Sequence, residues 1–520
     1  MDPDTEQLIE ALKQPEVWPG EVERVECVET HISWVFLTGD AAYKIRKPVD
    51  LGFLDFSTLV KRDHCAHEEV RLNRRFAPEL YLDVVRISGT PRRPVVCGAG
   101  KPLEVAVRMR QFDQSKQLDR ELEAGRLMPE DMIEVAREVA GFQERAPRAE
   151  LGDSYGALAH VLDPVRENFS QIRAALGEWG TERDRLANLE AVSERWATDL
   201  REVFQARRAG DFIREGHGDL HLANLTRLPE GIRAFDCIEF SADLRWIDVV
   251  NDIAFLFMDL GFQSRNDLGW WFVNAWLESS GDYRGLAVLR FYTLYRCMVR
   301  AKVAALRSLQ QSGAERATSE DNFRAHIKYA QALVAPAAPR VLLTTGLSGS
   351  GKSWVASRVA ANLGLVHIRS DVERKRLFGL GYDERSGSAL NAGIYSENAS
   401  QMTYARLAAL MRGVLECGHG VIIDATMLTR AQRGPLLESA RRSGVEAGIL
   451  HVTAAPAVLR TRIEQRARKS TDPSEANSVV LAAQMKHLEP PAESEGAWLL
   501  EVDNSGDLDI PGLIDQIRTR

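Results

Sequence analysis

The hydrophobic pattern of the N-terminal part of the chain changes from short strand-like runs to longer helical stretches. Brief apolar runs bounded by turn residues predict strands, and apolar residues that recur every three or four positions predict helices. A turn at Gly39-Asp40 separates the second and third runs. The predicted elements lie at 22–27, 34–37 and 43–46 (strands), 60–76 (helix), 103–109 (strand) and 115–209 (helices).

A different pattern begins after the alanine- and proline-rich segment 335–340. Continuous apolar runs there alternate with helical stretches, which is typical of a parallel sheet covered by helices. The runs lie at 341–345, 366–368, 421–423, 448–452 and 498–502. We therefore predict a bilobal α+β domain with lobes 1–110 and 111–334, a linker at 335–340, and an α/β domain at 341–520.

Composition narrows the class of protein. A chain of 520 residues needs more than one core, and 66 basic against 74 acidic residues give a net charge of −8. This balance gives no overall basic footprint for nucleic acid. The six cysteines lack metal-ligand spacing, no apolar run is long enough for a membrane span, and the first residues read MDPDTEQLIE. We expect a cytoplasmic protein without a membrane segment.

The motif with the most chemical content is HGDLHLAN at 217–224, followed by Asp236. An Asp and an Asn five positions apart, with a second Asp after the next strand, form a phosphoryl-transfer centre. Asp219 would orient an acceptor hydroxyl as catalytic base. Asn224 and Asp236 would hold Mg²⁺ on the phosphates of ATP.

A lysine in the third predicted strand is the candidate partner of the phosphates. Lys44 lies among apolar neighbours, where a charge is costly without an anion, although an edge lysine that reaches water is the alternative. Glu69 shares the apolar face of the following helix and is the candidate counter-ion, with Glu68 as the alternative. No glycine-rich loop precedes Lys44, so backbone amides and the Ser33 hydroxyl would have to cover the phosphates.

These motifs give residues 20–255 a family resemblance. The region resembles the aminoglycoside phosphotransferase-like branch of the kinase fold, which implies Asp219 as base, Asn224 and Asp236 as Mg²⁺ ligands, and Lys44 with Glu69 at the phosphates. The resemblance gives His217 a structural role and favours a bracing role for Asp252. His221 is expected to be a loop residue or an outer contact.

The second domain opens on an unrelated phosphate-binding motif. The strand at 341–345 runs into GLSGSGKS and then a helix, which is the context of a P-loop. Its glycines let backbone N–H groups surround phosphates, Lys352 neutralises them, and Ser353 binds Mg²⁺. The predicted nucleotide-binding residues are Gly346, Ser348, Gly349, Ser350, Gly351, Lys352 and Ser353.

Carboxylates follow two further strands of this domain. Asp371 and Asp424 come at strand ends that face the ligand crevice of a parallel sheet, where either could activate a hydroxyl or hold Mg²⁺. Capping of the next helix is the alternative for each. Arg462 and Arg466 are four positions apart and could close over the transferring phosphate, or belong to a solvated basic helix.

This domain resembles the small P-loop kinases that include gluconate kinase, chloramphenicol phosphotransferase and the 5′-hydroxyl kinase of polynucleotide kinases. The matched features include Asp371-x-x-Arg374, Asp424-x-Thr426 and SEA at 474–476. The resemblance implies Asp371 as catalytic base and Arg374 as acceptor-binding residue. It implies Arg462 and Arg466 as a catalytic lid, and we assign Asp424 to Mg²⁺.

The chain is therefore predicted to be an α+β bilobal protein-kinase-like domain followed by an α/β P-loop kinase domain with a parallel sheet. It resembles bacterial bifunctional proteins that join an aminoglycoside phosphotransferase-like domain to such a kinase. We expect ATP and Mg²⁺ as cofactors and hydroxyls of sugars or aminocyclitol-like molecules as acceptors. The alternative is a polynucleotide 5′-hydroxyl kinase whose first domain is a supporting or regulatory module. A basic cluster at 290–307 could be a solvated face or an anionic acceptor site.

Overall fold

The computed structural model describes residues 3–50, 54–150, 152–176, 180–336, 338–381, 384, 386, 393–469 and 477–520. The chain forms two compact units, one of residues 1–164 with 204–259 and the other of residues 165–203 with 260–520. The second unit groups the helices at 260–334 with the P-loop domain, and the domain boundaries proposed from the sequence stay a prediction. No helix in the described part of the chain has the length and apolar character that a membrane crossing requires.

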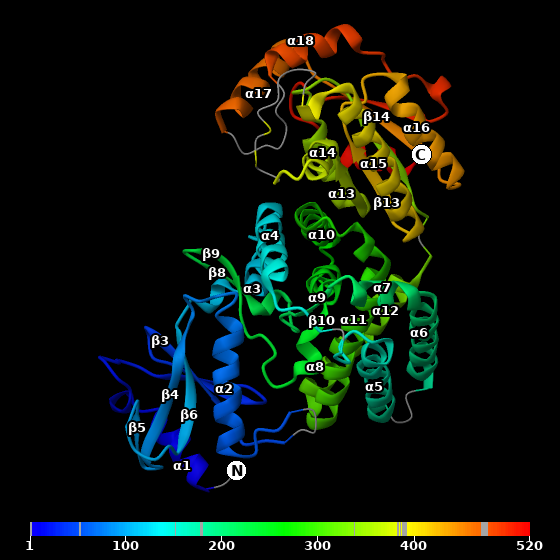
Figure 1. The fold of residues 1–520 in the computed structure, drawn as a ribbon. Helices are drawn as coiled ribbons and strands as arrows, with labels where there is room; N and C mark the ends of the chain where they lie inside the picture. The colour runs from blue at the N-terminus through cyan, green and yellow to red at the C-terminus, as the bar shows by residue number, and fades with distance from the viewer. Residues whose placement is uncertain are drawn as a thin grey trace. The chain divides into compact units, whose positions relative to one another are not determined.

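The first unit begins with a six-stranded antiparallel sheet in the order β1-β2-β3-β6-β4-β5. Helix α2 (Leu59–Asn73) packs on β4 and β6, as Figure 1 shows, and begins where the Thr58 hydroxyl accepts a bond from the N–H of Lys61. The strands are β1 (Glu26–Glu29), β2 (Ser33–Leu37), β3 (Ala41–Arg46), β4 (Tyr81–Thr90), β5 (Arg93–Val96) and β6 (Glu104–Arg110).

This sheet corrects two details of the sequence prediction. The first strand lies at Glu26–Glu29 rather than at 22–27, and the hairpin of β4 and β5 was not predicted. Strand β4 alternates buried and exposed positions irregularly, with a register shift between Tyr81 and Asp83. The period-2 pattern that marks a strand in sequence is therefore weak there.

The rest of the first unit carries the HGDLHLAN loop between two small antiparallel ribbons, β7 with β10 and β8 with β9. These ribbons fix the two ends of the loop. The helices are α1 (Pro3–Leu12), α3 (Leu118–Glu123), α4 (Pro129–Arg145), α7 (Arg201–Ala209), α8 (Ala242–Arg245) and α9 (Val249–Phe262). The strands are β7 (Ile213–Glu215), β8 (Leu225–Leu228), β9 (Gly231–Ala234) and β10 (Trp246–Asp248).

The second unit contains long helices before the P-loop domain, and their basic cluster has structural contacts. Arg290 donates to the carbonyls of Leu333 and Ala335 at 2.7 and 2.9 Å, where α12 ends. Arg296 is buried, with its guanidinium over the ring of Tyr295. The helices are α5 (Leu158–Leu176), α6 (Gly180–Asp199), α10 (Asn266–Ser280), α11 (Leu286–Gln310) and α12 (Gly313–Val334).

The P-loop domain is built on a five-stranded, wholly parallel sheet in the order β12-β13-β11-β14-β15. Every residue of β11 and β13 is buried, which is why these strands read as continuous apolar runs. The strands are β11 (Val341–Thr345), β12 (Leu365–Arg369), β13 (Gly420–Asp424), β14 (Ala447–Thr453) and β15 (Trp498–Asp503).

Helices surround this sheet, and Leu513, Ile514 and Ile517 of the last one complete the core against β11, β13 and β14. This topology brings the P-loop and the strand end at Asp424 to the same edge of the sheet. The helices are α13 (Lys352–Leu363), α14 (Ser370–Leu377), α15 (Glu397–Glu416), α16 (Arg430–Arg442), α17 (Pro456–Lys469), α18 (Ser478–His487) and α19 (Ile510–Arg518).

Candidate active sites

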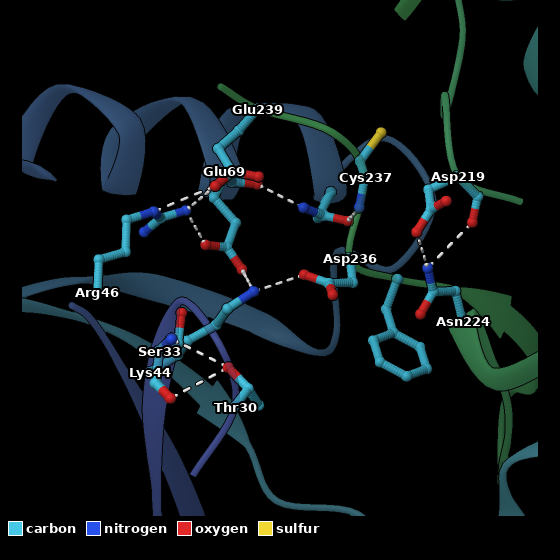
Figure 2. A network of polar contacts seen from close by, with 12 residues as sticks. Thr30, Ser33, Lys44, Arg46, Glu69, Asp219, Asn224, Asp236, Cys237 and Glu239 are labelled. Atoms are coloured by element: carbon cyan, nitrogen blue, oxygen red, sulfur yellow. Dashed lines mark hydrogen bonds and ion pairs between the residues drawn. The ribbon is translucent and has the colours of Figure 1, made fainter. Parts of the chain in front are cut away.

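In the first unit, Lys44 lies between two carboxylates. Its Nζ is 3.0 Å from Oε1 of Glu69 and also contacts Oδ1 of Asp236 (Figure 2). Burial by itself lowers the pKa of Lys44, but Asp236 and Glu69 reverse this effect and hold the pKa above its usual value. The contact selects Glu69 over Glu68, which instead pairs with Arg71 at 2.8 Å.

Sequence reasoning missed two members of this charge cluster. Arg46, two positions after Lys44 on the same face of β3, contacts Glu69 and donates from Nε to Oε1 of Glu239 at 3.1 Å. Glu69 is fully buried, so its charge requires the two cations. The sequence signal that could have identified Arg46 is the two-residue period of the strand, which places Lys44 and Arg46 on the same face of β3.

His217 joins the HGDLHLAN loop to the segment that carries Asp236. Its Nε2 lies 2.9 Å from the carbonyl oxygen of Phe235, and its Nδ1 accepts the N–H of Asp219 at 3.2 Å. These two bonds require the neutral tautomer with the proton on Nε2. Burial lowers the pKa of His217 and so favours that neutral form.

Asp252 braces the same loop from helix α9. Its two carboxylate oxygens accept the backbone N–H groups of His217 and Gly218, each at 2.8 Å. A Cβ at Gly216 would lie 2.3 Å from Asp252 Oδ2, so glycine is required for this approach. Gly218 has φ +84°, a conformation that also favours glycine. This geometry agrees with the bracing role that the resemblance implied.

Asp219 is held in place but stays accessible. The Nδ2 of Asn224 donates to its Oδ2 and to its carbonyl oxygen, both at 3.0 Å, while the side chain of Asp219 is 36% exposed. His221 Nε2 lies 3.3 Å from the same Oδ2. Sequence reasoning placed His221 in the loop without assigning it this direct contact.

Asp236 adopts a backbone conformation that is unusual for a residue with a side chain. Its φ is +62°, in the left-handed region, and its N–H donates to the hydroxyl of Tyr81 at 3.0 Å. The next N–H, of Cys237, donates to Oδ1 of Asn73 at 2.9 Å. Such strain persists where neighbouring contacts enforce it, as they do here, and it is common at functional sites.

The turn that stands in place of a glycine-rich loop is closed by its own hydrogen bonds. The Thr30 hydroxyl donates to the carbonyl of Ser33 at 3.1 Å and accepts its N–H at 3.0 Å. The Ser33 hydroxyl is buried and has no hydrogen-bond partner among the described residues. Figure 2 shows this turn near Lys44.

The second site is formed by the P-loop between β11 and α13. Gly346 and Gly351 have φ +144° and +85°, and a Cβ at either would lie 2.1 Å from another atom, Val452 O or Asn504 Nδ2. Asn504 also donates to the carbonyl of Ser350 at 2.9 Å, which keeps that carbonyl turned toward the protein. Lys352 Nζ donates to the carbonyl of Leu347 at 2.9 Å.

Asp424, at the end of β13, is part of this site and does not cap the next helix. His367 Nε2 lies 3.4 Å from its Oδ2, and the hydroxyl of Thr344 lies 3.4 Å from its Oδ1. Burial acts to raise the pKa of Asp424, but His367, Arg369 and Ser353 outweigh burial and lower the pKa to about 2. Asp424 is therefore a charged carboxylate at neutral pH.

The predicted acceptor residues lie on α14. Asp371 is half-buried in the first turn of this helix, and no side-chain cap forms at the helix N-terminus. Arg374 is buried, donates from Nη1 to the carbonyl of Ile394 at 2.9 Å, and lies over the ring of Tyr395. Its Nε has no hydrogen-bond partner among the described residues.

The predicted lid is described only in part. Arg462, on α17, donates from Nη1 to the carbonyl of Ser350 at 3.4 Å, so it reaches the P-loop. The side chain of Arg466 and the SEA segment at 474–476 lie outside the described residues. Gln484 adds a contact that the sequence did not indicate, because its Oε1 accepts the N–H of Ser348 at 2.8 Å.

Both sites fit Mg²⁺ by the chemistry of their donors. Asn224 with Asp236, and Ser353 with Asp424, offer the oxygen ligands that Mg²⁺ prefers. Among the described residues, no cluster of three or more His, Cys, Asp or Glu side chains could hold a metal ion by itself.

Some comparisons with known proteins concern parts of the chain. A family described as an AAA domain matches residues 341–491. Choline kinase from Cryptosporidium parvum Iowa II is similar over 63% of this chain and 96% of its own, with 12% identity and a TM-score of 0.40. A gluconokinase from Sinorhizobium meliloti 1021 is similar over 35% of this chain and 97% of its own, with 22% identity and a TM-score of 0.24. The six-stranded antiparallel sheet and the five-stranded parallel sheet of this chain, together with the AAA match, confirm the predicted fold class. The predicted class of enzyme, an ATP-dependent kinase or phosphotransferase, is confirmed as well.

The family is shown by longer alignments. The uncharacterized proteins Rv2004c and MT2060 of Mycobacterium tuberculosis and Mb2027c of Mycobacterium bovis are each 31% identical over 460 residues. The alignments cover 88% of this chain and 90% of each relative, so they span both domains. The chain belongs to the family of these mycobacterial proteins.

The bracing contact of Asp252 gives a testable prediction. Asp252→Ala leaves two buried N–H groups without an acceptor, which costs roughly 1–3 kcal/mol for each group. Hydrogen exchange followed by mass spectrometry should therefore show faster exchange of the peptide that contains His217 and Gly218. Asp243→Ala, which removes a carboxylate that is 66% exposed, is the matched control and should leave that exchange unchanged. Equal exchange in the two variants would contradict the bracing role.

Proposed function

We propose that this chain is a bifunctional ATP-dependent phosphotransferase that transfers the γ-phosphate to hydroxyls of small molecules such as sugars or aminocyclitols. The observation that carries the proposal is the Asp219 carboxylate, which Asn224 fixes in place while more than a third of the side chain stays exposed. A carboxylate in this condition can meet a substrate hydroxyl without first being rearranged. The second domain supports the same reading, because it holds a complete P-loop beside Asp424.

In the first site, each residue has a role that follows from its position. Asp219 would accept the proton of the acceptor hydroxyl as its oxygen attacks the γ-phosphorus. Lys44, preset by Glu69, would neutralise phosphate charge. Mg²⁺ held by Asn224 and Asp236 would supply the remaining neutralisation. The Ser33 hydroxyl, which has no partner in the described protein, is a donor for a phosphate oxygen.

In the second site, backbone N–H groups of residues 346–353 would surround the phosphates while Lys352 and Arg462 neutralise their charge. Lys352 would leave the carbonyl of Leu347 to do so. Asp371 would orient the acceptor hydroxyl, and Arg374 would bind another part of the same acceptor. Ser353 and Asp424 would hold Mg²⁺, directly or through water.

Single-site variants of the full-length chain test the two activities. Asp219→Ala should lower formation of one phosphorylated product by about 10²- to 10⁴-fold, because it removes the proton acceptor. Lys352→Ala should abolish formation of a second phosphorylated product. For each variant, ATP consumption and product formation are measured across a panel of sugars and aminocyclitols. Asp243→Ala, which removes an exposed carboxylate, is the control.

The pattern of losses distinguishes the proposal from its main rival. If Asp219→Ala only changes the rate at which the Lys352-dependent product forms, the first domain is a regulatory nucleotide-binding module. If wild-type protein consumes no ATP with any alcohol in the panel, the proposed acceptor class is wrong.

A polynucleotide acceptor is the second candidate, and one observation favours it. Arg374 is a buried cation with an unpartnered Nε among the described residues, and it lies against the ring of Tyr395. A cation beside an aromatic ring suits a phosphate and a base of a nucleic-acid end. The net charge of −8 does not favour this acceptor.

Transfer of labelled phosphate to the 5′ end of an oligonucleotide tests this candidate. If the acceptor is a nucleic acid, wild-type protein should label the oligonucleotide, and Asp371→Ala should reduce labelling by about 10²-fold or more. Because phosphate contacts weaken with salt, labelling should also fall as salt concentration rises. Absence of labelling at low salt would exclude this candidate.

A further inference from the structure

Helix α10 supplies hydrogen bonds to the edge strand of the P-loop domain. The side chain of Asn274 donates from Nδ2 to the carbonyl of Leu365 at 3.0 Å, and its Oδ1 accepts the N–H of His367 at 2.9 Å. Strand β12 is at the end of the sheet, so β13 pairs with it on one side only. The amide of Asn274 therefore satisfies backbone groups that a further strand would otherwise bind.

The residue that Asn274 holds is in contact with the candidate Mg²⁺ ligand. His367 is bonded through its backbone to Asn274 and through its Nε2 to Asp424, at 3.4 Å. Both His367 and Asn274 are buried. A change in the position of β12 relative to α10 would therefore move the imidazole that fixes the Asp424 carboxylate.

A second connection lies one helical turn further along α10. Arg369, at the end of β12, lies between two carboxylates: its Nη1 is 3.3 Å from Glu278 Oε1, and its Nε is 3.9 Å from Asp424 Oδ2. The carbonyl of Glu278 also accepts a bond from Arg376 of α14, the helix that carries Asp371. Asn274 and Glu278, four positions apart, are on one face of α10.

We propose that α10 is a working part of the P-loop site, in which Asn274 and Glu278 are positioning residues that set the geometry and charge at Asp424. Asn274 fixes β12 and thereby His367. Glu278 places a negative charge beside Arg369, whose positive charge lies close to Asp424 and opposes a cation there. The inference rests on the proposed function, because it takes Asp424 as the Mg²⁺ ligand of that site.

The test measures Mg²⁺-dependent binding of ADP to the full-length chain by calorimetry. The component of binding that Lys352→Ala removes is assigned to the P-loop site. In Glu278→Gln, the Mg²⁺ concentration that gives half of this component should rise by about three- to tenfold, because the negative charge of Glu278 no longer offsets the positive charge of Arg369 beside Asp424. Binding of ADP in the absence of Mg²⁺ should stay unchanged.

Two further variants complete the test. Asn274→Asp places a carboxylate against the carbonyl of Leu365, so it should also raise the Mg²⁺ requirement. Ser279→Ala is the matched control on the same helix, since its exposed hydroxyl bonds only within the helix, to the carbonyl of Ala275, and it should behave as wild type. Thermal unfolding confirms that each variant is folded.

The outcomes separate the inference from the function on which it rests. If Glu278→Gln retains the Lys352-dependent component of ADP binding with the Mg²⁺ dependence of wild type, the proposed role of α10 is wrong. The assignment of nucleotide binding to the P-loop would then still hold. If Lys352→Ala removes no component of ADP binding, the assignment of nucleotide binding to the P-loop is wrong, and the proposed role of α10 is wrong with it.

Discussion

The first site depends on a carboxylate that has no access to water. Glu69 is fully buried, and a buried charge is tolerated only when it is paired and hydrogen-bonded. Lys44 and Arg46 both reach it from β3, and each also contacts a second carboxylate, Asp236 or Glu239 (Figure 2). Charges of opposite sign therefore alternate through the cluster. Removing Arg46, for example, would leave the buried Glu239 without the guanidinium that pairs with it and Glu69 with Lys44 as its remaining cation in this network. The fold therefore fixes the position of Lys44.

The two candidate sites would neutralise phosphate charge in different ways. The first uses side chains, and its β1–β2 turn is closed by its own bonds between Thr30 and Ser33. The second uses backbone geometry, since Gly346 and Gly351 approach other atoms so closely that no side chain fits. A side-chain site needs a rigid network around each charge. A backbone site needs glycine at a few positions and a cation beside them, and Lys352, which donates to the carbonyl of Leu347, is that cation here.

Local spacing in the sequence was enough to predict some of these features and not others. HGDLHLAN and GLSGSGKS are short motifs whose chemistry lies within a few residues, and the strands of the parallel sheet are marked by fully buried apolar runs. The Arg46–Glu239 pair joins residues 193 positions apart, and no local pattern connects them. His221 was assigned to the loop because spacing does not show which way a loop side chain points. The β4–β5 hairpin was missed because its alternation is irregular.

The contacts of α10 join the P-loop domain to a part of the chain that precedes the segment 335–340. The alanine- and proline-rich segment 335–340 is a natural place to divide the chain, yet the compact unit that contains the P-loop begins well before it. The physical reason is the edge strand: β12 exposes backbone groups that need partners, and Asn274 provides them from a helix that precedes the segment. A parallel sheet with an uncovered edge next to Asp424 would be both prone to pairing with other chains and free to shift. Covering that edge with a helix of the preceding region fixes the strand and Asp424 together.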